Sequence, residues 1–162
     1  MTNKYKPHLL VLPEDRATSE IANGFCLELG VNDRNIQILQ WARGWRRVVE
    51  DFIDIHSLEM QKLPNRMIVL LIDFDGQIER LNEVKHKIPE ELSNRVFILS
   101  VLLEPEDLRR CVGKSFENIG KELASNCVNN KDGLWDHALL KHNKSELDRM
   151  IKAVKPFLFD VL

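Results

Sequence analysis

The sequence predicts an α/β protein with a mostly parallel, four-stranded sheet flanked by helices. Three observations lead to this prediction. Short apolar runs recur along the chain, stretches with apolar residues at helical spacing separate them, and three of the four runs lead into acidic residues. Strands joined by long helical crossovers pair in parallel, with right-handed connections. The chain has 162 residues, which is about the length of one domain.

Four segments are typical of strands. The predicted strands are residues 8–12, 35–39, 67–72 and 95–101. The first is a continuous apolar run between two prolines, as expected for a strand that is buried on both faces. The third, MIVLLI, has no polar residue, which indicates a central position in the sheet.

Apolar residues spaced by three and four predict the helices between these strands. The predicted helices cover residues 18–29, 45–58 and 78–87, and about 105–127 and 134–154. Gly30 is expected to cap the first helix and Pro89 to stop the third. We expect a single domain over residues 1–162, with a core at about 8–110 and a C-terminal helical extension at about 111–162.

Charge, apolar runs and cysteine spacing argue against a globally basic, a membrane-spanning, a secreted and a disulfide-rich protein. The 23 Lys and Arg against 25 Asp and Glu give a net charge of −2, so contact with nucleic acid has to be local. No apolar run approaches the ~20 residues that span a bilayer, and the first apolar run is too short for a secretory signal. We therefore expect a cytoplasmic protein without membrane contact. Cys26, Cys111 and Cys127 include no C-x-x-C pair, which argues against a disulfide framework or a zinc site.

Acidic residues follow three of the predicted strands. The pairs are Glu14 and Asp15, Asp73 and Asp75, and Glu104 and Glu106. The carboxyl ends of parallel strands share one sheet edge, and residues two apart in an extended segment point the same way. Two carboxylates about 4 Å apart repel by roughly 4 kcal/mol at an effective dielectric constant of 20, so a bound cation would stabilise such a cluster. Oxygen ligands alone favour Mg²⁺ or Mn²⁺.

The alternative for each acidic pair is a turn in which the side chain caps the following helix. Any one pair is a weak signal. Their joint occurrence at one predicted edge favours a metal site.

Residues 41–47, WARGWRR, form the densest basic and aromatic cluster in the chain. Arg43, Trp45, Arg46 and Arg47 are therefore candidate contacts for the phosphates and bases of a nucleic acid. In the alternative interpretation the tryptophan begins a helix and the arginines pair with acidic residues one turn later.

The acidic pattern resembles the TOPRIM domain, a metal-dependent catalytic module shared by topoisomerases, bacterial primases and OLD-type nucleases. That family has a Glu after the first strand, a D-x-D after the third and, in OLD-like members, another acidic pair after the next. These places match Glu14 in LLVLPED, Asp73 and Asp75 in LLIDFDG, and Glu104 and Glu106 in LLEPEDL. The PED segment and RVFILSVLLEPEDL look more narrowly like small stand-alone OLD/RloB-type TOPRIM proteins of prokaryotic defence loci.

This resemblance implies a TOPRIM or Rossmann-like fold and a nuclease, or another protein that transfers phosphodiester groups of DNA or RNA with Mg²⁺ or Mn²⁺. It implies catalytic and metal-binding roles for Glu14, Asp73 and Asp75, with Glu104 and Glu106 holding a second ion. Two ions about 3.5 to 4 Å apart would stabilise the attacking and leaving oxygens. A partner ATPase is also implied.

Two alternatives remain open. Asp15 stands where the family usually has glycine, so the fold could serve as a binding or regulatory subunit without cleavage. DFDG also resembles the nucleophile motif of haloacid-dehalogenase-type phosphatases, in which the first Asp attacks phosphorus. Ser100 and Lys114 would then stand for later motifs of that family.

An apolar stripe at helical spacing lies near the C-terminus. It consists of Leu147, Met150, Ile151, Val154 and Phe157, followed by Phe159, Val161 and Leu162. We expect it to pack on the sheet, and the alternative is a partner surface that forms a homo-oligomer through the C-terminal helix.

Overall fold

The computed structural model describes residues 2–160 and confirms the predicted α/β fold. The strands are β1 (His8–Pro13), β2 (Ile36–Ile38), β3 (Arg66–Asp73) and β4 (Val96–Val101). All neighbouring strands are parallel, in the order β2-β1-β3-β4. Val11 of β1 lies opposite Ile38 and Val69, and Val69 lies opposite Phe97. The two long apolar runs therefore form the centre of the sheet, which confirms the central position predicted for the third strand.

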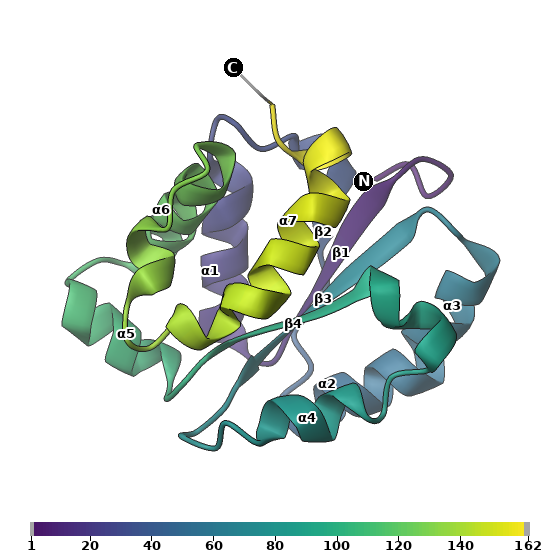
Figure 1. Cartoon of the computed structure of the whole chain (residues 1–162), viewed down its shortest axis with the longest axis horizontal. Helices are drawn as coiled ribbons and strands as arrows, with labels where there is room; N and C mark the ends of the chain where they lie inside the picture. The colour runs from purple at the N-terminus through teal and green to yellow at the C-terminus, as the bar shows by residue number, and fades with distance from the viewer. Residues whose placement is uncertain (1, 161–162) are drawn as a thin grey trace.

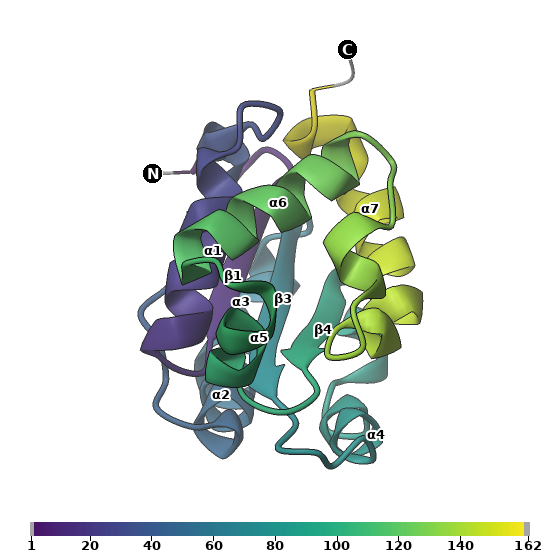
Figure 2. The same ribbon diagram turned by 90° about the vertical axis from the view of Figure 1, so that its left-hand side faces the viewer.

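Helices cover both faces of the sheet (Figures 1 and 2). The helices are α1 (Arg16–Leu27), α2 (Trp45–Asp51), α3 (Ser57–Lys62), α4 (Arg80–Lys85), α5 (Pro105–Val112), α6 (Phe116–Val128) and α7 (Lys144–Leu158). A π-helical turn, Phe52–His56, joins α2 to α3. Helices α1, α5, α6 and α7 lie on one face, and α2, α3 and α4 lie on the other. No helix within residues 2–160 is both long and apolar enough to cross a bilayer.

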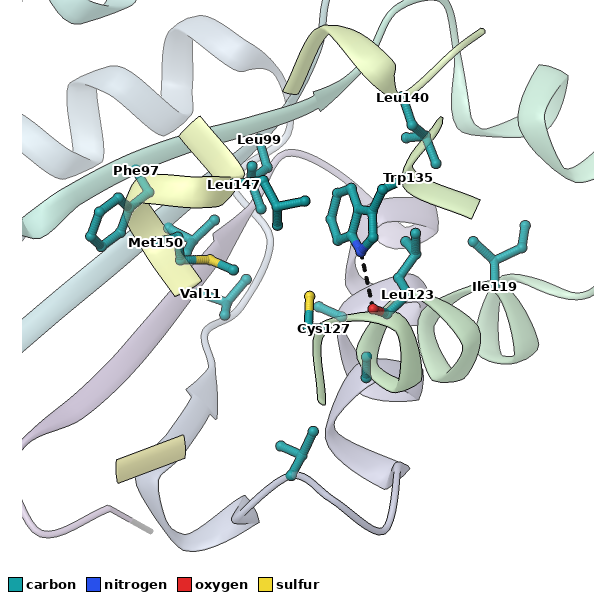
Figure 3. Close-up of a cluster of buried hydrophobic side chains, with 14 of the residues drawn as sticks. Val11, Phe97, Leu99, Ile119, Leu123, Cys127, Trp135, Leu140, Leu147 and Met150 are labelled. Carbon is teal, nitrogen blue, oxygen red and sulfur yellow. Dashed lines mark hydrogen bonds between the residues drawn. The ribbon is translucent and has the colours of Figure 1, made fainter. Parts of the chain in front are cut away.

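Alternation along the strands divides the core into two layers. Leu9 and Val11 of β1 belong to the cluster beneath α1, α6 and α7, whereas Leu10 and Leu12 belong to the cluster beneath α2 and α3. Figure 3 shows part of the first cluster, in which the indole N–H of Trp135 donates a hydrogen bond to a backbone carbonyl of α6, with a donor–acceptor distance of 3.0 Å. Both central strands are thus buried on both faces.

The C-terminal half differs from the prediction in its helix boundaries. The apolar spacing predicts one helix at about 105–127, but Gly113, with φ of +66°, separates α5 from α6. The expected helix at 134–154 is two short 3₁₀ turns followed by α7. Gly30 does not cap α1, whose C-cap is Glu28. A Cβ at Gly30 would lie 2.6 Å from the Val128 side chain, so this glycine serves a close chain approach.

Helix α7 packs on the sheet with its apolar stripe, as predicted. Leu147, Met150, Val154 and Leu158 are buried in the first core cluster. Val161 and Leu162 lie outside the described residues. The chain's own core therefore covers the stripe on which a homo-oligomer was predicted, and the oligomer itself stays a prediction.

Side chains at the start of α7 occupy the outer edge of β4. The contacts are Asn143 with Ser100, Glu146 with Ile98, and Arg149 with Val96. Asn143 both accepts from the N–H and donates to the carbonyl of Ser100, at 2.9 and 2.7 Å. These side chains satisfy the backbone groups that another strand would otherwise bind.

Helices α1 and α6 cross at two glycines. A Cβ at Gly24 would overlap the backbone carbonyl of Glu117, and a Cβ at Gly120 would overlap that of Ile21. The two backbones therefore touch directly, and this contact holds α6 against α1 on one face of the sheet (Figure 2).

Candidate metal centre

Two of the predicted site residues meet at the carboxyl ends of β1 and β3. Glu14 directly follows β1, and Asp73 is the last residue of β3. The Glu14 Oε2 atom accepts a hydrogen bond from the backbone N–H of Asp73, with an oxygen–nitrogen distance of 2.6 Å. Their exposed fractions are only 9% and 6%. The parallel sheet thus places together two carboxyl groups that lie 59 residues apart in the chain.

The Asp73 carboxyl group has an unusual environment. Its Oδ1 atom is buried and has no hydrogen-bond partner within residues 2–160. Burial, followed by the negative charges of Glu14, Asp15, Asp75 and Glu106, raises the pKa of Asp73 to about 9. A carboxylate that is desolvated among other carboxylates either takes up a proton or binds a cation.

Burial also raises the pKa of Glu14, to about 7. The hydrogen bond from the Asp73 N–H opposes this rise because it stabilises the ionised form. A carboxyl group with a pKa in this range can exchange a proton at neutral pH, which suits general acid or base chemistry.

Asp75 does not lie as predicted. Its φ is +51°, so the segment after β3 is not extended, and the alternation that placed both D-x-D side chains on one side does not apply. The Asp75 Oδ2 atom instead pairs with Nη1 of Arg80 at 2.8 Å, and its side chain is 47% exposed. Gly76, with φ of +78°, completes this turn.

Glu104 and Glu106 lie at the start of α5, the first as its N-cap and the second in its first turn. Glu104 is the N-cap, and its backbone N–H donates to the Asp107 carboxylate. Both glutamates are exposed. Glu106 is close enough to raise the pKa of Asp73. Glu106 therefore lies near the centre, whereas Glu104 has the helix-start role of the alternative interpretation.

The described part of the chain contains no closed cage of acidic residues. Within residues 2–160, no three Asp, Glu, His or Cys side chains converge as a ready set of metal ligands. Magnesium usually takes one or two protein carboxylates and keeps water or substrate phosphate in its other positions. Asp73, with its unpartnered oxygen, and the adjacent Glu14 fit that smaller requirement.

The basic and aromatic cluster begins beside Glu14. The backbone N–H of Arg43 donates to the Glu14 carbonyl at 2.8 Å, and φ of Arg43 is +73°. Arg43 and Arg46 are exposed. Arg47 instead pairs with Asp51 at 3.1 Å, as its alternative interpretation expects. The structure thus places the predicted substrate-binding residues at the same sheet edge as the acidic pair.

Arg80 is a site residue that sequence reasoning missed. Its Nη1 atom donates to the Asp73 carbonyl at 2.7 Å as well as to Asp75. Its guanidinium lies over the Trp45 ring, 4.6 Å from the ring centre. Nothing in the sequence marks this residue, because the contact joins two helices that follow different strands.

The residues named for a phosphatase have other partners. The Ser100 hydroxyl forms a hydrogen bond with Nε2 of His142, at 2.7 Å. The Lys114 ammonium pairs with Glu122 at 2.8 Å. The haloacid-dehalogenase alternative therefore gains no support from these two side chains.

Comparisons of the chain with protein-family models, curated proteins and solved structures gave no match. The fold and the site therefore define the class on their own: an α/β protein with an all-parallel sheet and a buried acidic pair at the strand ends. The TOPRIM resemblance stays a prediction.

We expect the metal-free protein to lose stability as the pH rises from about 5 to about 9. The pKa values of Glu14 and Asp73 in the folded protein, about 7 and about 9, exceed their ordinary values of 4.5 and 3.8. Between its ordinary and its folded-state pKa, each group binds more protons in the folded than in the unfolded state. Its stability contribution is therefore complete below the ordinary pKa and is lost as the pH rises through the folded-state pKa. The raised pKa of Glu14 alone lowers the free energy of unfolding over this pH range by on the order of 3 kcal/mol.

Urea unfolding in EDTA at a series of pH values measures this loss. Asp73→Asn removes one of the two titrating groups, so its stability profile should be flatter. A wild-type stability that rises over this pH range would contradict the prediction.

Proposed function

We propose that this protein is a Mg²⁺- or Mn²⁺-dependent nuclease that hydrolyses phosphodiester bonds of DNA or RNA. The observation that carries the proposal is the buried Oδ1 of Asp73, which lies beside Glu14 and has no hydrogen-bond partner in residues 2–160. A bound divalent cation would polarise the phosphoryl oxygens and lower the pKa of an attacking water. Asp73 is the residue best placed to hold such a cation, and Asp75 is the second.

Glu14 has the acid–base role in this proposal. Hydrolysis forms a bond from the water oxygen to phosphorus and breaks the bond from phosphorus to the leaving oxygen. One proton leaves the water, and one proton, which solvent water can supply, reaches the leaving oxygen. Glu14 lies directly beside Asp73, so its carboxylate is placed to take the first of these protons from a water on the cation.

The substrate in this proposal lies across the loop that precedes α2. Arg43 and Arg46 supply positive charge for phosphates. Trp45 holds two cations at this place, because the guanidinium groups of Arg46 and Arg80 lie over its ring, 5.1 and 4.6 Å from the ring centre. Because the net charge is −2, binding should depend on this local cluster. The partner ATPase and the cytoplasmic location implied by the sequence stay predictions.

Incubating the protein with plasmid DNA, single-stranded DNA and RNA in Mn²⁺, Mg²⁺ or EDTA tests the proposal. We expect cleavage with the metals, none in EDTA, and a loss of at least about a hundredfold in Glu14→Gln, which keeps the hydrogen-bond acceptor but cannot take the proton. Glu20→Gln is the matched control, because Glu20 is on α1 and pairs only with Arg16 among the residues described. Cleavage that survives EDTA, or that Glu14→Gln retains, would argue against the proposal.

A binding or regulatory subunit without cleavage is the second candidate. The absence of three converging ligands within residues 2–160 favours it. The same experiment separates the two candidates. The subunit would be supported if the protein binds nucleic acid, if Arg43→Gln weakens this binding, and if no metal condition gives cleavage.

A further inference from the structure

Arg80 is a buried cation at the acidic site. Its exposed fraction is 7%, and its Nε atom has no hydrogen-bond partner among residues 2–160. Trp45 covers the guanidinium plane, and Nη1 donates to both the Asp73 carbonyl and the Asp75 carboxylate. A guanidinium in this position is largely desolvated, so the nearby carboxylate provides most of its charge compensation.

Asp75 can change partner. Its side chain is 47% exposed, and it lies two residues after the end of β3, with a left-handed backbone conformation. The turn itself is anchored separately, because the Gly76 N–H donates to the Leu102 carbonyl at 2.7 Å. The carboxylate can therefore rotate about its own side-chain bonds while the backbone stays in place.

We propose that Arg80 acts as a stand-in cation, which holds Asp75 in the metal-free protein and releases it when Mg²⁺ or Mn²⁺ binds beside Asp73. This inference rests on the proposed function. It explains why no third ligand converges on Asp73 in the described chain, because the second aspartate of the D-x-D motif, Asp75, is paired with Arg80. After the exchange, Trp45 still holds the guanidinium, whose N–H groups are then free to donate to a phosphate oxygen.

The exchange predicts opposite effects on ion binding and on cleavage. Arg80→Gln removes the competing charge, so the dissociation constant for Mn²⁺ should fall about fivefold, because Asp75 no longer has to leave an ion pair. Cleavage at saturating Mn²⁺ should instead fall at least about tenfold, because the phosphate loses its donor. A residue that only supported the fold would weaken both.

Calorimetric titration with Mn²⁺ alone, without nucleic acid, measures the first effect. Lys87→Gln is the matched control, because it makes the same charge change just beyond α4 at an exposed residue. Unchanged or weaker Mn²⁺ binding by Arg80→Gln, with clear binding by the wild type, overturns this inference alone. No Mn²⁺ binding by the wild type overturns the proposed function as well.

A second measurement needs no variant. In ¹H–¹⁵N spectra of the wild-type protein, the guanidinium signals of Arg80 should shift when Mg²⁺ is added, because Nη1 loses the Asp75 carboxylate. Signals that stay in place while Mg²⁺ binds would show that the Arg80–Asp75 pair persists, which overturns the exchange.

Discussion

Asp73→Asn is expected to abolish metal-dependent cleavage and, at the same time, to stabilise the metal-free protein. The asparagine side chain keeps the shape of the aspartate but carries no charge to hold a cation, so the cleavage rate should fall by at least about a thousandfold. Because the pKa of Asp73 is about 9 in the folded metal-free protein, the folded state has to hold a proton at pH 8 that the unfolded chain releases, and asparagine removes this cost. The free energy of unfolding at about pH 8 should therefore rise by about 1 to 3 kcal/mol.

Cleavage assays and urea unfolding on the same preparations measure both effects. Asp54→Asn is a suitable control, because Asp54 is exposed in the turn between α2 and α3. Its stability and its cleavage rate should match those of the wild type. Lower stability in Asp73→Asn would mean that the aspartate supports the fold, and retained cleavage would exclude it as a metal ligand.

Gly120→Ala is expected to destabilise the protein by about 3 kcal/mol, although alanine is the better helix former. The new Cβ would overlap the Ile21 carbonyl and crowd the Phe25 backbone N, and neither backbone group can rotate away. Helix α6 would have to move away from α1, which would open the first core cluster shown in Figure 3.

Thermal and urea unfolding by circular dichroism measure this cost. Asn118→Ala on the exposed side of α6 is the control, and it should change stability by only a few tenths of a kcal/mol. A Gly120→Ala protein as stable as the wild type would show that the two helices can separate freely.

The strand pattern of this fold was predictable from the sequence because a strand that is buried on both faces is a short, continuous run of apolar residues. The runs that form β1 and β3 are apolar at nearly every position, and their bounds agree with the structure to within one residue. The helix boundaries after β4 were less predictable. Gly113 breaks the helical pattern by its positive φ, and apolar spacing alone does not show that break.

The candidate site was predictable only in part. The rule for parallel strand ends correctly placed Glu14 beside Asp73, because topology alone decides that neighbourhood. The direction of Asp75 depends on a single backbone torsion. The position of Arg80 depends on a stacking contact with Trp45, which lies 35 residues earlier in the chain. The spacing of apolar residues predicts neither the Asp75 torsion nor the Arg80–Trp45 contact.

The side chains that border β4 set a limit on how this molecule can associate. Because Asn143, Glu146 and Arg149 already use the outward backbone groups of that strand, a second molecule finds no open ladder there to extend. The last helix is therefore more than a cover for apolar surface. Its side chains also block this edge of the sheet. A chain without the helix would expose unpaired backbone groups on β4, and such an exposed strand favours the growth of fibrous aggregates.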